Sequence, residues 1–85
     1  MGLMKDIARN IQQLRKERGF VPTEILSTAY VSGLESDDLL SLENLKNELA
    51  YYVRVKQVIM SPNKLDNVDY KDIEIDGRKI LISVQ

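Results

Sequence analysis

The chain has 85 residues, 44% of them hydrophobic and 29% charged, which is typical of one soluble globular domain and too short for two. Cysteine and histidine are absent, which excludes disulfides, thiolate nucleophiles, Cys/His zinc sites and histidine acid–base catalysis. The net charge is −1, so the overall basic character usual in nucleic-acid-binding proteins is missing.

The first predicted element is an amphipathic helix over residues 3–18. Its apolar positions recur at helical spacing and are Leu3, Ile7, Ile11 and Leu14, with Met4 and Ala8 beside them. Gly19 provides the left-handed residue that commonly follows a helix, and bases fill the last turn, where they favour the helix dipole. No capping residue precedes the first turn, so we expect a fragment of a longer chain, with Met1 and Gly2 as candidates for added residues.

A strand is predicted from Glu24 to Ser32, after an extended link at residues 20–22, because the segment is rich in β-branched and aromatic residues. Both faces of this strand mix polar and apolar side chains, so the sequence does not decide which face is buried. Gly33 marks the turn out of the strand.

A second helix is predicted from Asp37 to about Tyr51, since leucines recur at intervals of three and four. Ser36 is the expected capping residue. A strand then follows over residues 53–60, where valines alternate with bases, and residues 61–63 have loop chemistry.

The last two strands are predicted to form a hairpin with its turn at Asp76-Gly77. The opposed pairs are Ile73 with Ile80 and Glu74 with Lys79. In the first of these strands, over residues 68–75, the apolar residues are even-numbered at first (Val68, Tyr70) and odd-numbered later (Ile73, Ile75). This shift predicts a bulge near Lys71-Asp72.

These elements predict an α+β domain in the order helix–strand–helix–strand–strand–strand. Two helices are expected to pack on one face of a mixed four-stranded sheet, because no other element can cover it. No internal domain boundary is evident, so residues 1–85 are treated as one small domain.

Acidic clusters in the chain have structural interpretations. Residues 72–77 imitate the opening of a calcium loop, but Ser83 stands where the closing acid is needed. Asp37 and Asp38 are neighbours on a helix and do not converge, which favours a role at the helix start over a metal or acid pair. With no nucleotide or nucleophile motif either, we expect no catalytic, cofactor or metal residues here.

Bases concentrate in two segments of the sequence. Residues 1–18 carry five bases and two acids, and residues 53–64 carry three bases and no acid. The segment from Tyr51 to Lys56 interleaves aromatics with bases, as nucleic-acid surfaces often do. The alternative, favoured by the sequence alone, places Tyr52 in the core and makes Arg54 and Lys56 the solvent face of a strand.

Four segments resemble the C-terminal part of isoleucyl-tRNA synthetases of the archaeal and eukaryotic type, in the right order. They are Ile11 to Phe20 (IQQLRKERGF), Pro22 to Ile25, Asn47 to Val58, and Glu74 to Ile80 (EIDGRKI). The sequence departs from the family in having Thr23-Glu24 where a single acidic residue precedes the strand. In that family the ligase reaction, with ATP and magnesium, takes place on a different domain bearing HIGH and KMSKS motifs, which are absent here.

The resemblance implies a cytoplasmic, non-catalytic C-terminal domain of a class I isoleucine–tRNA ligase. Its expected partners are tRNA, held by backbone contacts, and the rest of the parent enzyme. No membrane partner is expected, since no apolar run approaches the roughly 20 residues of a membrane helix. The bases that we expect to contact tRNA are Arg9, Arg15, Lys16, Arg54 and Lys56. The alternative is a protein–protein interaction or packing module with no RNA contact.

Overall fold

The computed structural model describes residues 3–21 and 23–85, without the side chain of Leu3. Met1, Gly2 and Pro22, and the expectations attached to them, lie outside the described residues. The elements are α1 (Leu3–Glu17), β1 (Leu26–Ser32), α2 (Ser36–Glu43), α3 (Lys46–Val53), β2 (Val55–Ser61), β3 (Lys71–Ile75) and β4 (Arg78–Val84). The predicted α+β class is confirmed, and the described residues form three helices in place of the two predicted.

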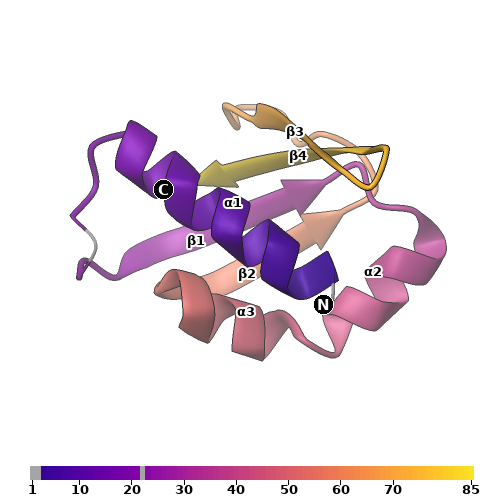
Figure 1. Cartoon of the computed structure of the whole chain (residues 1–85), viewed down its shortest axis with the longest axis horizontal. Coiled ribbons are helices and arrows are strands. Elements are labelled where there is room, and N and C mark those ends of the chain that lie inside the picture. Colours follow the sequence, from indigo (N-terminus) through magenta and orange to yellow (C-terminus); the bar gives the residue numbers. More distant parts are fainter. Residues whose placement is uncertain (1–2, 22) are drawn as a thin grey trace.

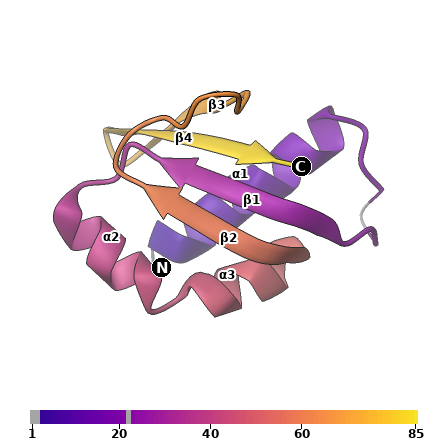
Figure 2. The same cartoon turned by 180° about the vertical axis from the view of Figure 1, so that it is seen from behind.

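The sheet has the strand order β2-β1-β4-β3. Strands β1 and β2 are parallel and are joined by α2 and α3, whereas β4 is antiparallel to both of its neighbours. The helices lie on one side of this mixed sheet (Figures 1 and 2), as the sequence predicts. Strand β4 comes last in the chain but occupies a central place between β1 and β3.

The core lies between the helices and this face of the sheet. Its most completely buried large side chains come from every layer and are Ile7, Ile11, Leu42, Leu49, Ile80, Ile82, Val31 and Val53. The apolar stripe predicted for the first helix therefore faces the sheet. At about 25 cal/mol per Å2 of apolar surface removed from water, this burial is the main stabilising contribution to the fold.

The hairpin is confirmed in both turn and register. Ile73 pairs with Ile80 and Glu74 with Lys79. Asp76 and Gly77 have φ angles of 51° and 80°, which are the left-handed values that a two-residue hairpin turn of type I′ requires. The bulge predicted near Lys71-Asp72 is wrong. Strand β3 begins only at Lys71, so Val68 and Tyr70, the even-numbered apolar residues, lie before the strand and not within it.

A bulge occurs instead in β1. The backbone N–H groups of Ser27 and Thr28 both donate to the carbonyl oxygen of Gln85, at 2.9 and 3.3 Å, so two residues of β1 oppose one residue next to β4. This extra residue places Leu26 and Ala29 in the same core, although their numbers differ in parity. It explains why both faces of the strand look mixed in the sequence.

The second predicted helix is broken at Asn44-Leu45. The N–H of Leu45 donates to the carbonyl of Leu42 at 2.9 Å, a tight three-residue turn that ends α2. Asn is a poor helix former because its side chain competes for backbone groups, and α3 starts afresh at Lys46. The predicted cap is also wrong: Ser36 is the first helical residue, and Glu35 precedes it without a side-chain capping bond.

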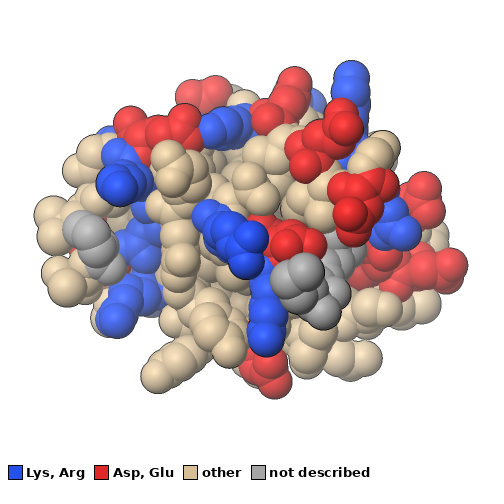
Figure 3. Space-filling model, viewed as in Figure 1, with Lys and Arg blue, Asp and Glu red and all other residues tan. Residues whose placement is uncertain are grey.

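Charges are unevenly distributed over the face that carries the helices. Figure 3 shows Lys and Arg side chains over α1 and toward the end of the molecule where α1 ends. Asp and Glu side chains lie mainly along the opposite edge and toward α2 and the hairpin. The near-zero net charge of the chain therefore comes with a partial separation of the two signs of charge on this face.

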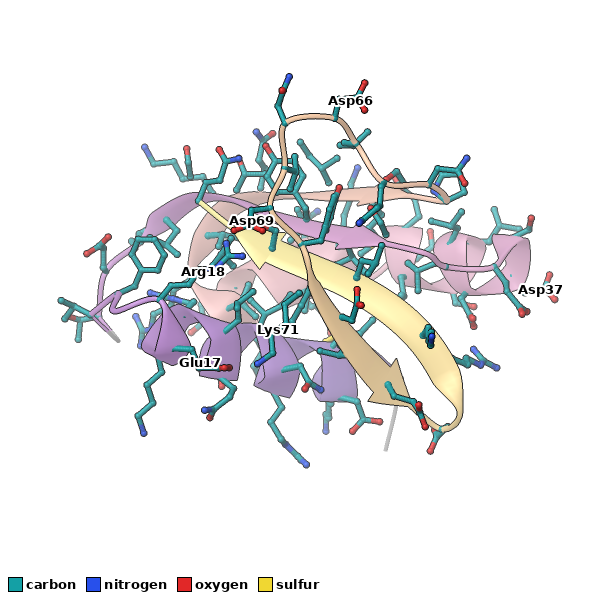
Figure 4. All side chains as sticks on the ribbon, turned by 90° about the horizontal axis from the view of Figure 1, so that it is seen from above. Glu17, Arg18, Asp37, Asp66, Asp69 and Lys71 are labelled. Atoms are coloured by element: carbon teal, nitrogen blue, oxygen red, sulfur yellow. The ribbon has the colours of Figure 1, made fainter. Side chains whose placement is uncertain are left out.

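Ion pairs attach the helices to the β3–β4 hairpin. Lys71 of β3 contacts Glu17 at the end of α1, and Arg78 of β4 contacts Asp38 of α2. The hydrogen bond from Arg78 to Asp38, together with the charge of Asp38, raises the pKa of the guanidinium. Arg18 binds the carbonyl oxygen of Asp69 at 2.6 Å, and Figure 4 shows the Glu17–Lys71 and Arg18–Asp69 neighbours side by side.

Candidate nucleic-acid interface

A hollow of about 400 Å3 lies where the end of α1 meets the link to β1 and the junction of α3 with β2. Its lining residues come from all three segments and are Gln12, Arg15, Lys16, Phe20, Thr23 and Arg54. Gln12 holds the two helices together here, since its side-chain amide donates to the carbonyl of Tyr52 at 2.7 Å. The hollow therefore brings together the two basic segments of the sequence, which are about 40 residues apart.

Arg15 supports this hollow from inside. Its residue surface is only 5% exposed, and its guanidinium donates to the carbonyl oxygens of Val53 and Glu24 and, at 3.3 Å, to that of Val21. Its Nε is buried without a partner among the described residues. Because both terminal nitrogens of its guanidinium donate to backbone carbonyls, Arg15 is a structural clamp in this fold and does not present charge to a phosphate.

The sequence contained a signal for this role. Arg15 follows Ala8 by seven residues and Ile11 by four, which places it on the same face of α1 as these two buried residues. An arginine on the apolar face of a helix must find acceptors inside the protein, because a buried unpaired charge is costly. Its position in the last turn of the helix predicts an exposed cation instead.

Lys16 and Arg54 are exposed at the edge of the hollow. Arg54 ends α3 in a left-handed conformation, with φ 56° and ψ 55°, and so lies before β2 rather than within the strand. Arg9 is exposed on α1, seven residues or about two turns before Lys16. Lys56 is exposed on β2 but is not among the lining residues, so the structure groups Lys16 with Arg54 most directly.

Two exposed tyrosines accompany these bases. Tyr51 is 83% exposed and Tyr52 48% exposed, and their rings stand edge to face with centroids 6.3 Å apart. The expectation that Tyr52 belongs to the core is wrong, because Leu49 and Val53 occupy the buried positions of α3. A second hollow of about 350 Å3 is lined by Tyr51, Tyr52, Asn47 and Glu48.

The exposed cations of this region are not held in ion pairs within the described part of the chain. Four ion pairs are found among residues 3–21 and 23–85, and none of them includes Arg9, Lys16 or Arg54. Their charges are thus not neutralised by a contacting carboxylate, and Figure 3 places bases over this end of the helical face. Such an arrangement can hold phosphates by charge and can offer aromatic faces to unpaired bases.

Other site classes receive no support from the described part of the chain. Within it, no group of three or more acidic side chains converges in the way that a metal ion requires. Asp38, one of the two neighbouring acids in the first turn of α2, is engaged with Arg78, while Asp37 lies at the outer end of that helix in Figure 4. None of the described helices has both the length and the apolar character needed to cross a bilayer.

No family model matches this chain, and no curated protein matches it.

Proposed function

We propose that the chain is a non-catalytic tRNA-binding domain appended to a class I aminoacyl-tRNA synthetase of the isoleucine type. The observation that carries the proposal is the hollow edged by Lys16 and Arg54, which the Gln12–Tyr52 hydrogen bond connects to the last turn of α3, where Tyr51 and Tyr52 are exposed. Unpaired surface cations next to exposed aromatic rings are typical of surfaces that bind nucleic acid.

The resemblance to the synthetase family supports the same conclusion from a different direction. Two of the four resembling segments, residues 11–20 and 47–58, contribute most of the lining of the hollow. If the parent enzyme uses ATP and magnesium, these act on its catalytic domain, and this chain adds affinity for the tRNA.

The cations would act on the RNA backbone. Long basic side chains neutralise phosphates and position the nucleic acid, but they carry little sequence information. We therefore expect weak binding that is similar for all tRNAs, since few contacts are made by a domain with a net charge of −1.

The proposal is tested by measuring the affinity of the purified chain for unfractionated tRNA at low salt. The double variant Lys16→Ala/Arg54→Ala should bind about 2- to 30-fold more weakly, because each exposed charge contact contributes about 0.2–1 kcal/mol. The matched control is Lys64→Ala/Lys79→Ala, which removes two exposed cations from outside the hollow. Equal losses in both double variants, or no binding by the wild type, would contradict the proposal.

A packing module is the second candidate, supported by exposed apolar residues on the link before β1. Val21 is 55% exposed and Ile25 63% exposed, and such residues often mark contacts with another protein domain. Replacing both by Ser should leave tRNA affinity unchanged if the first proposal holds. An absence of tRNA binding, combined with association between this chain and the rest of a parent synthetase, would favour the packing role.

A further inference from the structure

The four tyrosines of the chain fall into two structurally different pairs. Tyr30 and Tyr70 lie on the sheet face away from the helices, with edge-to-face rings, and the Tyr70 hydroxyl accepts hydrogen bonds from Ser32 and from the backbone of Leu65. Tyr51 and Tyr52 have no hydrogen-bond partner for their hydroxyls among the described residues. The first pair packs the domain together, whereas the second stands on its surface.

The exposed rings of Tyr51 and Tyr52 leave a large apolar area in contact with water. Tyr51 is 83% exposed and Tyr52 48% exposed, so burying their rings against a flat partner would remove much apolar surface from water. The ring planes are inclined by 73°, so one flat group can stack on one ring while its edge meets the other. The adjoining hollow of about 350 Å3 gives such a group a place to sit.

The polar residues of this second hollow fit the edge of a nucleobase. Asn47 has an amide that both donates and accepts, and Glu48 has a carboxylate that accepts from an amino group. The carboxylate repels phosphates, whereas Lys16 and Arg54, at the hollow that Gln12 connects to Tyr52, attract them. The charges therefore favour an orientation with the base in the hollow of α3 and the backbone toward the end of α1, the helices that lie next to each other in Figure 1.

We infer that this surface takes single-stranded RNA, with one unpaired base stacked on the Tyr51–Tyr52 pair and the flanking phosphates at Lys16 and Arg54. The inference rests on the proposed function for RNA as the partner, and it adds that the bound part is unpaired. A base inside an A-form duplex is stacked between its neighbours and cannot offer a face to tyrosine, whereas unpaired bases stack readily on aromatic side chains.

The test compares two fluorescent probes at the same low salt concentration: a single-stranded RNA of about 12 nucleotides and a blunt duplex of the same length. The wild-type chain should bind the single strand more tightly than the duplex. Tyr51→Ala/Tyr52→Ala should lose about 5- to 100-fold in affinity for the single strand and none for the duplex. Tyr51→Phe/Tyr52→Phe, which keeps the rings, should bind as the wild type does.

A matched control is Leu40→Ala, because Leu40 is a 70% exposed apolar residue on α2. It should leave affinity for both probes unchanged, and circular dichroism verifies that each variant is folded. Tyrosine emission gives a second readout, since the chain has no tryptophan: bound RNA should quench the wild type and quench the Phe variant much less.

The outcomes separate this inference from the proposed function. Equal affinity for both probes, with a loss for both in Lys16→Ala/Arg54→Ala, would overturn stacking and leave phosphate binding intact. A Phe variant as weak as the Ala variant would also overturn stacking, because the hydroxyls would then carry the contact. No binding of either probe by the wild type would refute RNA as the partner altogether.

Discussion

Replacing Arg15 by Met should destabilise the protein without removing a contact to RNA. The arginine connects three segments, because its guanidinium donates to carbonyls of the link before β1 and of α3. Methionine fills a similar apolar volume but donates no hydrogen bond. The substitution therefore removes the hydrogen bonds of Arg15 while keeping most of the apolar packing of its side chain.

The magnitude follows from the three acceptors. The carbonyl of Val53 lies in a buried setting, and losing a charged donor there costs about 2 kcal/mol. Glu24 and Val21 are exposed residues, so water replaces much of the lost bonding, and together they add about 1 kcal/mol. The expected loss is about 3 kcal/mol, out of a total stability of roughly 5–10 kcal/mol for a domain of this size.

Urea unfolding followed by circular dichroism measures this loss. With a slope of about 1 kcal/mol per molar urea, the midpoint should fall by about 3 M. The control is the adjacent Lys16→Met, which alters an exposed side chain and should change stability by less than about 0.5 kcal/mol. If both variants unfold at the same urea concentration, or if Arg15→Met weakens tRNA binding more than Lys16→Met does while still folded, the clamp is refuted.

Three further predictions concern the turn, the salt dependence and catalysis. Gly77→Ala should lower stability by about 1–2 kcal/mol in a thermal melt, because φ is +80° there, and an unchanged melt would show that the turn tolerates a side chain. The affinity for tRNA should fall with salt at a log–log slope no steeper than about −3 to −4, as only Arg9, Lys16, Arg54 and Lys56 are exposed candidates; a much steeper slope would mean that other cations take part. The purified chain should not exchange pyrophosphate with ATP and any amino acid, and observed exchange would overturn the non-catalytic assignment.

The sequence predicts the hairpin and the first helix well because their signals are local. Asp76-Gly77 determines a two-residue turn, and that turn sets the pairing of Ile73 with Ile80 without reference to the rest of the fold. The sequence does not reveal the break at Asn44-Leu45, because the leucine spacing continues through it. The bulge at Ser27-Thr28 depends on Gln85, a residue almost 60 positions away, which no local pattern can reveal.

The candidate site was predicted in part. The charge of Lys16 and Arg54 and the resemblance of the segments that hold them predict these two residues as tRNA contacts, and the structure brings them to one hollow. The same reasoning predicts Arg15 as a contact, but Arg15 is buried, since charge patterns do not distinguish an exposed cation from a clamp. Tyr51 and Tyr52 were recognised as an aromatic segment, but their exposure depends on which face of α3 meets the sheet, and that follows from Leu49 and Val53.

The central place of β4 constrains how this protein can be made. On the ribosome, α1, β1, α2, α3 and β2 emerge before β4. Among the described strands β3 pairs with β4 alone, and β1 lacks one neighbour until residues 78–84 arrive. Until then, the inner edge of β1 exposes unpaired backbone groups and the core lacks Ile80 and Ile82. Folding must therefore be completed after translation of β4, and a nascent chain stalled before residue 78 should remain open to proteases and chaperones.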